Sequence, residues 1–162
     1  MVQKLATIDT TPVVIAAPLP SALGDESALK VDSYGALWTV STQIGVEETV
    51  LASAARTTTV NTEFTNTRYK GVTIVIDVTV YPSSASITPF IEGYSTLGND
   101  WYTILEGAAI GAVSVTVLRV YPTMAASENL IAVDVLPPTW RFRMAVADAE
   151  SMTYSVNAIH MP

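Results

Sequence analysis

Cysteine is absent from this 162-residue sequence, and histidine occurs once, as His160. The lack of cysteine excludes disulfide bonds, thiolate metal ligands and thiol nucleophiles together. A single histidine leaves the common zinc sites and a Ser-His-Asp triad without enough partners. We therefore interpret His160, close to the end of the sequence, as a solvated side chain. Stability must therefore come from packing of the apolar residues, which make up 49% of the chain, with subunit contacts as an optional further source.

Positive charge is scarce. Eight lysine and arginine residues face fifteen aspartate and glutamate residues, so the formal net charge is −7. Without a basic patch, nucleic acids and anionic membrane surfaces are poor candidate partners. No stretch approaches the roughly 20 apolar residues that span a bilayer. A cleaved signal peptide is an alternative interpretation of Lys4 followed by Val13–Ala17, but Asp9 and the neighbouring prolines favour an extended arm.

Carboxylates are the remaining candidates for chemistry, because glycosidases use a pair of them. Four lie on or near expected strands, with the first two on adjacent ones: Asp77, Glu92, Glu106 and Asp134. Any small β-sandwich brings some carboxylates together, so we interpret these four as solvated residues of an outer face.

Two short acidic segments, Asp25-Glu26 and Asn99-Asp100, offer too few oxygen ligands for a dedicated calcium site. The glycines are isolated from one another, so no phosphate-binding loop is predicted. We therefore assign no catalytic, cofactor-binding or metal-binding residue and no cofactor. The sequence predicts a protein that is not an enzyme.

Aromatic side chains would form a sugar-binding face if they aligned on one exposed sheet. The candidates for such stacking are Trp101, Tyr102, Tyr94, Tyr69 and Tyr154. Core packing is the alternative, and we expect it for Trp101 and Trp140, because large aromatic side chains dominate protein cores.

Residues 1–45 differ in composition from the rest of the chain. Pro12, Pro18, Pro20 and Gly24 interrupt any regular pattern. We predict an extended N-terminal arm over residues 1–45, with short extended pieces at 29–31 and 36–40, and a β-sandwich domain over residues 46–162. Exposure of the apolar arm to water would be unfavourable, so we expect it to pack on its own domain or on a neighbouring subunit. A disordered tail is the alternative.

From Val46 onward, apolar residues recur at every second position, as in half-buried strands. The alternation is clearest over residues 72–80, 140–146 and 152–158. Only Asp148–Glu150 separate the last two runs, which is short enough for a hairpin. In residues 113–121 the apolar set changes phase at Val117-Leu118, which indicates either a β-bulge or a strand buried on both faces. Residues 46–56 fit a helix or a strand, and the threonines that follow favour the strand.

Two further expected strands, 87–94 and 101–105, flank a turn-rich loop at residues 95–100. Pro82, Pro122 and the Pro137-Pro138 pair mark strand ends, because proline cannot donate a hydrogen bond to a sheet. Eight or nine strands joined mostly by short turns predict an all-β protein. The expected fold is a two-sheet antiparallel β-sandwich of jelly-roll or Greek-key type with an extended N-terminal arm.

Several segments resemble small virion structural proteins of tailed bacteriophages. They are residues 50–57 (VLASAART), 64–67 (FTNT), 71–79 (GVTIVIDVT), 101–105 (WYTIL) and 118–122 (LRVYP), and the most specific are 134–143 (DVLPPTWRFR) and 148–156 (DAESMTYSV). The similarity spans residues 46–160 and leaves out the arm. It implies a β-sandwich protein that decorates the capsid exterior, commonly as a trimer clamping neighbouring major capsid subunits, and it supplies no catalytic residues.

The expected function is therefore capsid decoration and stabilisation. The expected partners are the major capsid protein and further copies of the chain, most plausibly in a homotrimer, and the expected location is the outer surface of a virion assembled in the host cytoplasm. Binding to a repeating lattice multiplies modest affinities through avidity. Two alternatives remain: a structural component of the phage tail or neck, and a carbohydrate-binding module that mediates host attachment.

Overall fold

The fold was analysed in a computed structural model, which describes residues 29–31, 37–39, 45–82, 84–148 and 150–162. The chain divides into two compact units, Met1–Thr42 and Gln43–Pro162. In the first unit, β1 (Leu29–Val31) pairs with β2 (Leu37–Thr39) in an antiparallel manner. These strands confirm the two extended pieces expected there. The other residues on which the arm prediction rests lie outside the described residues.

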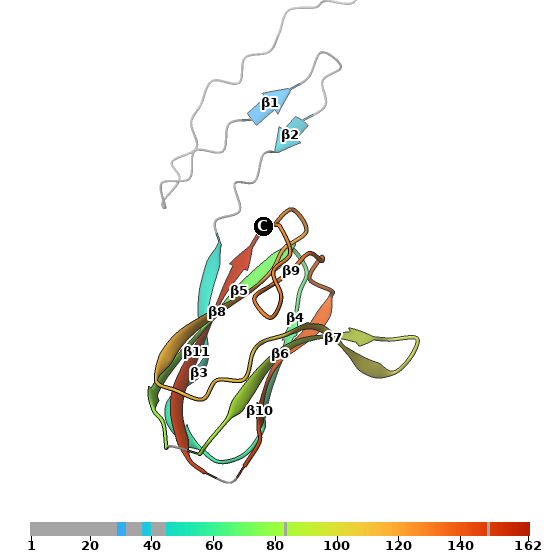
Figure 1. The fold of residues 1–162 in the computed structure, drawn as a ribbon. Helices are drawn as coiled ribbons and strands as arrows, with labels where there is room; N and C mark the ends of the chain where they lie inside the picture. The colour runs from blue at the N-terminus through green and yellow to red at the C-terminus, as the bar shows by residue number, and fades with distance from the viewer. Residues whose placement is uncertain (1–28, 32–36, 40–44, 83, 149) are drawn as a thin grey trace, which may run out of the picture. The chain divides into compact units, whose positions relative to one another are not determined.

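The second unit is built from two sheets that face each other (Figure 1). Among the described residues it has nine strands: β3 (Val46–Arg56), β4 (Val60–Thr65), β5 (Gly71–Val80), β6 (Ile87–Ser95), β7 (Asp100–Glu106), β8 (Ser114–Val120), β9 (Ile131–Ala132), β10 (Thr139–Val146) and β11 (Met152–Met161). One sheet has the order β3-β11-β5-β8-β9 and the other β4-β10-β6-β7. Residues 46–56 are thus a strand, as the neighbouring threonines predicted.

The pairing of strands identifies the topology. Antiparallel pairs are nested one inside the next: β6 with β7, β5 with β8, β4 with β10, and β3 with β11. Successive pairs alternate between the two sheets, which is the arrangement of an eight-stranded jelly roll. The short strand β9 is an addition that pairs in parallel with the end of β8. The predicted fold class, an all-β sandwich of jelly-roll type, is confirmed.

The hydrophobic core fills the space between the sheets. Alternate residues of β10 and β11 are buried, and the others lie on the outer faces. The largest fully buried side chains are those of Trp140, Tyr154, Phe142, Ile74, Ile76, Ile87, Ile91, Leu118, Met144 and Met152. The rings of Trp140 and Phe64 stack with their centroids 4.2 Å apart and an interplanar angle of 14°. The inward direction predicted for Trp140 is therefore correct.

The expected hairpin between β10 and β11 is wrong. β10 pairs with β4 and β6 in the four-stranded sheet, whereas β11 pairs with β3 and β5 in the five-stranded sheet. The short connection crosses from one sheet to the other, because in nested pairing the partners of the last two strands are β4 and β3. The length of the connection does not reveal this change of sheet, because the sheet that each strand joins depends on the distant strands with which it pairs.

The interpretation of the phase change in β8 is also wrong. β8 pairs with β5 in an unbroken register from Ser114 to Val120, so there is no bulge in this ladder. The strand is not buried on both faces either, because Val115 on its outer face is 65% exposed. Instead, hydroxyl side chains occupy the inward positions at Ser114 and Thr116, and valines occupy the outward positions.

Candidate functional site

His160 is buried. The expectation that it is a solvated side chain, which rested on its position near the end of the sequence, is therefore wrong. Only 7% of His160 is exposed, and its Nε2 atom lies 2.7 Å from Glu48 Oε1. Its ring packs near Phe64, Tyr69 and Trp140, with centroid distances of 6.1, 4.9 and 5.9 Å. The sequence did contain the signal, because the inward alternation of β11 from Met152 continues to position 160. Packing among aromatic rings makes His160 part of the core.

The candidate carboxylates do not form a catalytic pair. Asp77 lies on β5 and Glu92 on β6, and these strands belong to different sheets, so the two are not on adjacent strands as expected. Glu106 and Asp134 are exposed. Glu92 differs from the others because it is only 5% exposed, although it points to the outer face of its sheet. Its interpretation as a solvated residue is therefore wrong.

Glu92 is held by two arginines of the neighbouring strand β10. Arg141 donates from Nε to Glu92 Oε2, and Arg143 donates from Nε and Nη2 to Oε1 at 3.0 and 2.7 Å. Arg141 lies directly across the ladder from Glu92, and Arg143 is two residues further along the same face. Each guanidinium also stacks on an aromatic ring, Arg141 over Trp101 at 4.2 Å and Arg143 over Phe90 at 3.9 Å. This Arg141–Glu92–Arg143 cluster covers the middle of the outer face.

The cluster changes the acidity of its carboxyl group. Burial by itself raises the pKa of Glu92, but hydrogen bonds from Arg143 and Arg141, and their positive charges, outweigh burial. The pKa of Glu92 is therefore lowered from its ordinary value of 4.5. A carboxylate held ionised between two cations cannot act as a general acid near neutral pH, since that role requires a raised pKa. The cluster thus favours a structural or binding role.

The candidate aromatic side chains separate into two groups. Trp101 and Tyr94 lie across the β6–β7 ladder from each other, with ring centroids 5.1 Å apart, on the same outer face as the cluster. Trp101 is half-buried there, so core packing was the wrong expectation for it. Tyr102 packs close to Gly93 on the opposite face, Tyr69 lies beside His160, and Tyr154 is buried in the core. Two of the five candidates therefore share an exposed sheet.

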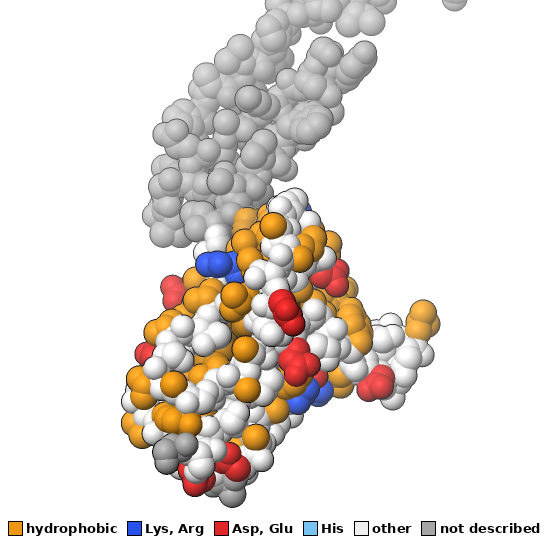
Figure 2. Space-filling view, in the orientation of Figure 1, with side chains coloured by type: hydrophobic (Ala, Val, Ile, Leu, Met, Phe, Trp, Pro, Cys, Tyr) orange, Lys and Arg blue, Asp and Glu red, His pale blue; other side chains and the backbone are white. Residues whose placement is uncertain are grey.

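A second feature lies on the outer face of the five-stranded sheet. We call it the valine strip: Val75, Val113, Val115 and Val117. Val75 and Val117 are cross-strand partners, Val115 lies across from Asp77, and Val113 immediately precedes the first paired residue of β8. In Figure 2 the side of the sandwich over β8 shows hydrophobic side chains with few charged ones between them. Contiguous apolar side chains on an outer sheet face are typical of a surface that another protein covers.

The two short acidic segments give no sign of a cation site. Asp25-Glu26 lies outside the described residues. In the other segment, Asn99 Oδ1 accepts a hydrogen bond from the Tyr94 hydroxyl at 2.7 Å, and Asp100 Oδ1 accepts one from the Trp101 N–H at 2.8 Å. Across the described ranges, no three histidine, aspartate or glutamate side chains are grouped closely enough to hold a metal ion. The same ranges contain no helix with the length and hydropathy needed to cross a membrane.

The fold and the outer faces define the chain as a jelly-roll β-sandwich. No protein-family model matches its sequence, and a search of curated proteins finds no match either. The similarity to bacteriophage virion proteins therefore stays a prediction.

Proposed function

We propose that the protein is a non-enzymatic structural protein that decorates and stabilises a bacteriophage capsid. In this proposal it binds the major capsid protein as a homo-oligomer, most plausibly a trimer, on the outer surface of a virion assembled in the host cytoplasm. The valine strip is the observation that carries the proposal. Val115 is 65% exposed at an outward position of β8, where alternation would place a polar residue on a free sheet face, and Val113, just before the strand, is 63% exposed.

The fold and the charge are consistent with this role. Jelly rolls are common in viral capsid and lectin domains, although a fold alone does not determine function. The net charge of −7 disfavours nucleic acid as the partner. An apolar strip on a rigid sheet suits a protein surface, because the burial of apolar area drives most protein association.

A charge placed in the valine strip should weaken capsid binding. We expect Val115→Asp to lower the affinity for bare capsids by about tenfold or more, because an unpaired carboxylate would be buried in the contact. The measurement is co-sedimentation of the protein with capsids over a range of protein concentrations. Thr58→Asp, in the exposed turn between β3 and β4, adds the same charge and should bind as the unmodified protein does. Equal binding of the two variants would remove the strip from the interface.

Host-glycan binding is the second candidate, and the outer face of the four-stranded sheet favours it. Trp101 and Tyr94 could stack on a sugar ring, and the guanidinium groups of Arg141 and Arg143 could donate hydrogen bonds to its hydroxyls. A glycan array separates the two functions. Capsid decoration predicts no signal, whereas a carbohydrate-binding module predicts a signal that Trp101→Ala abolishes.

A further inference from the structure

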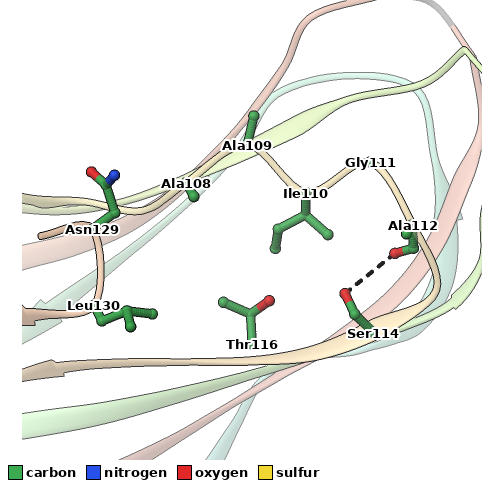
Figure 3. Close-up of a pocket in the computed structure, with 9 residues that line it drawn as sticks. All are labelled: Ala108, Ala109, Ile110, Gly111, Ala112, Ser114, Thr116, Asn129 and Leu130. Atoms are coloured by element: carbon green, nitrogen blue, oxygen red, sulfur yellow. Dashed lines mark hydrogen bonds between the residues drawn. The ribbon is translucent and has the colours of Figure 1, made fainter.

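The two sheets leave a slot open along one side of the sandwich. It lies between the segment 107–112 and β8, has a volume of about 340 Å³, and is lined by Ala108, Ala109, Ile110, Gly111, Ala112, Ser114, Thr116, Asn129 and Leu130. Figure 3 shows Ile110 on one wall and Thr116 on the other pointing into the space between them, with Leu130 at one end. None of the lining side chains is charged, and most are small.

The two walls belong to different sheets. Gly107 donates its N–H to Pro89 O at 2.8 Å, and Ile110 exchanges two backbone hydrogen bonds with Ile87 at 2.8 and 3.2 Å. The segment 107–112 is therefore bonded to the β6 side of the four-stranded sheet. β8 is bonded to β5 in the five-stranded sheet. The slot is the seam between the sheets.

The edge of β8 that faces the slot is free over five residues. β9 pairs with β8 only at Arg119 and Val120, and no other described strand pairs with this edge, so residues 114–118 have no strand partner there. Arg119 donates its N–H to Leu130 O, on the slot side. Because backbone groups of alternate residues point to the same edge of a strand, those of Val115 and Val117 also face the slot. A free edge of this kind accepts an added strand.

The segment 107–112 approaches β8 closely at one end of the slot and is joined to it by a chain turn at the other. At the first end, a Cβ atom on Gly107 would lie 2.7 Å from Pro89 Cγ and 3.2 Å from a Leu118 methyl carbon. At the start of β8 the chain turns from Ala112 into Ser114 and joins the two walls, and Ser114 Oγ donates to Ala112 O at 3.3 Å across this turn (Figure 3). The inward positions Ser114 and Thr116 are half-buried, whereas Leu118 and Val120 on the same face are fully buried. The inward face of β8 is therefore less completely covered at Ser114 and Thr116 than at Leu118 and Val120.

We propose that the N-terminal arm of a second copy fills this slot, with residues Val13–Ala17 added as a strand to the free edge of β8. These five residues lie between Pro12 and Pro18, so all five keep the N–H that a sheet requires. Their number equals the free length of β8. No charged residue occurs between Asp9 and Asp25, which matches the uncharged lining.

Exchange of the arm between copies would let a chain of net charge −7 associate with itself through an uncharged contact. Exchanging an identical element between protomers is a low-cost route to an oligomer. The prolines that flank Val13–Ala17 restrict the free arm, so less conformational entropy is lost on binding. Residues 1–28 precede the first described strand, which leaves ample chain for the connection. The inference does not depend on the capsid role, because the slot and the valine strip are separate surfaces.

Engineered cysteines test the proposal directly, because the natural chain has none. One full-length chain carries Val14→Cys or Ile15→Cys, whose side chains point to opposite faces of an extended segment. A second, affinity-tagged chain carries Thr116→Cys, or Ser114→Cys if the first variant does not fold. After mixing and mild oxidation, we expect a mixed disulfide between the two chains for one of the arm positions.

The control chain carries Ser53→Cys, which is exposed on the edge strand β3 of the same sheet. We expect about tenfold more mixed disulfide with the slot cysteine than with this control, because a bound arm raises the local thiol concentration. Equal yields would overturn the slot assignment. A third chain carries both the arm cysteine and the slot cysteine. If a disulfide forms only within this chain and not between two chains, the arm binds its own domain, which would overturn exchange between copies.

A second measurement tests whether the arm is needed for the oligomer, by determining the mass of the protein in solution. Ile15→Asp places a charge in the middle of the proposed strand, so light scattering should show loss of the oligomer while the β-sheet circular dichroism is unchanged. An oligomer mass unaffected by Ile15→Asp would contradict the proposal.

Discussion

Replacement of Trp140 by alanine should lower the free energy of unfolding by about 3–5 kcal/mol, the cost typical of deleting a large buried aromatic side chain. The side chain is fully buried near the start of β10, and its ring stacks on that of Phe64 with the centroids 4.2 Å apart. Its removal leaves a cavity that β10 cannot close by moving, because unbroken ladders hold this strand to β4 and β6 on either side. Urea denaturation followed by circular dichroism measures the change.

The matched control is Leu97→Ala. Leu97 is a large apolar residue at the fully exposed tip of the β6–β7 hairpin, and its change should stay within about 0.5 kcal/mol. If Trp140→Ala proved equally neutral, the inward face of β10 would be wrongly assigned, and with it the core of the sandwich.

Replacement of Glu92 by glutamine should lower the free energy of unfolding by about 2–3 kcal/mol at neutral pH. Breaking a buried ion pair typically costs 3–5 kcal/mol, and the partial exposure of the Arg141 and Arg143 side chains, 18% and 25%, reduces that figure. Without the carboxylate, the two guanidinium groups repel each other, and one of the two acceptor oxygens is replaced by an amide NH2 group that cannot accept a hydrogen bond. Glu106→Gln, at an exposed position on β7, removes the same charge and should have little effect.

The effect of Glu92→Gln should depend on pH with a defined sign. The pKa of Glu92 is lowered in the folded state from 4.5, so its stabilising contribution is present above pH 4.5. As the pH falls below 4.5, the unfolded chain takes up the proton more readily, and the contribution is lost as the pH passes through the lowered pKa. Denaturation at a series of pH values should therefore show the difference between protein and variant shrinking in acid. A difference that stayed constant would contradict the assigned cause.

The sequence predicts the core strands well because alternation is a local property. In β10, Trp140, Phe142 and Met144 are apolar at every second position, and all three are buried. The same alternation extends to His160 in β11, but a polar residue near the chain's end does not by itself reveal the aromatic rings that surround it. The register of distant strands decides that burial.

Features that depend on pairing between distant strands are not readable from the sequence. Glu92 meets Arg141 only because β6 and β10 are neighbours in one register, although 49 residues separate the pair. The sheet change between β10 and β11 depends likewise on nested pairing. In β8, the inverted pattern of inward hydroxyls and outward valines corresponds to the slot beside Ser114 and Thr116, which arises from the arrangement of segments distant in sequence. Such exceptions to alternation mark the surfaces on which the proposals rest.

The measurement that tests capsid decoration most directly is the copy number of this protein in purified virus particles, determined by quantitative mass spectrometry against the major capsid protein. Decoration of a capsid lattice predicts hundreds of copies per particle, in a fixed ratio to the capsid subunits, that are lost together from the outer surface under mild denaturant. A small number of copies that remain with isolated tails, or absence from particles, would contradict it.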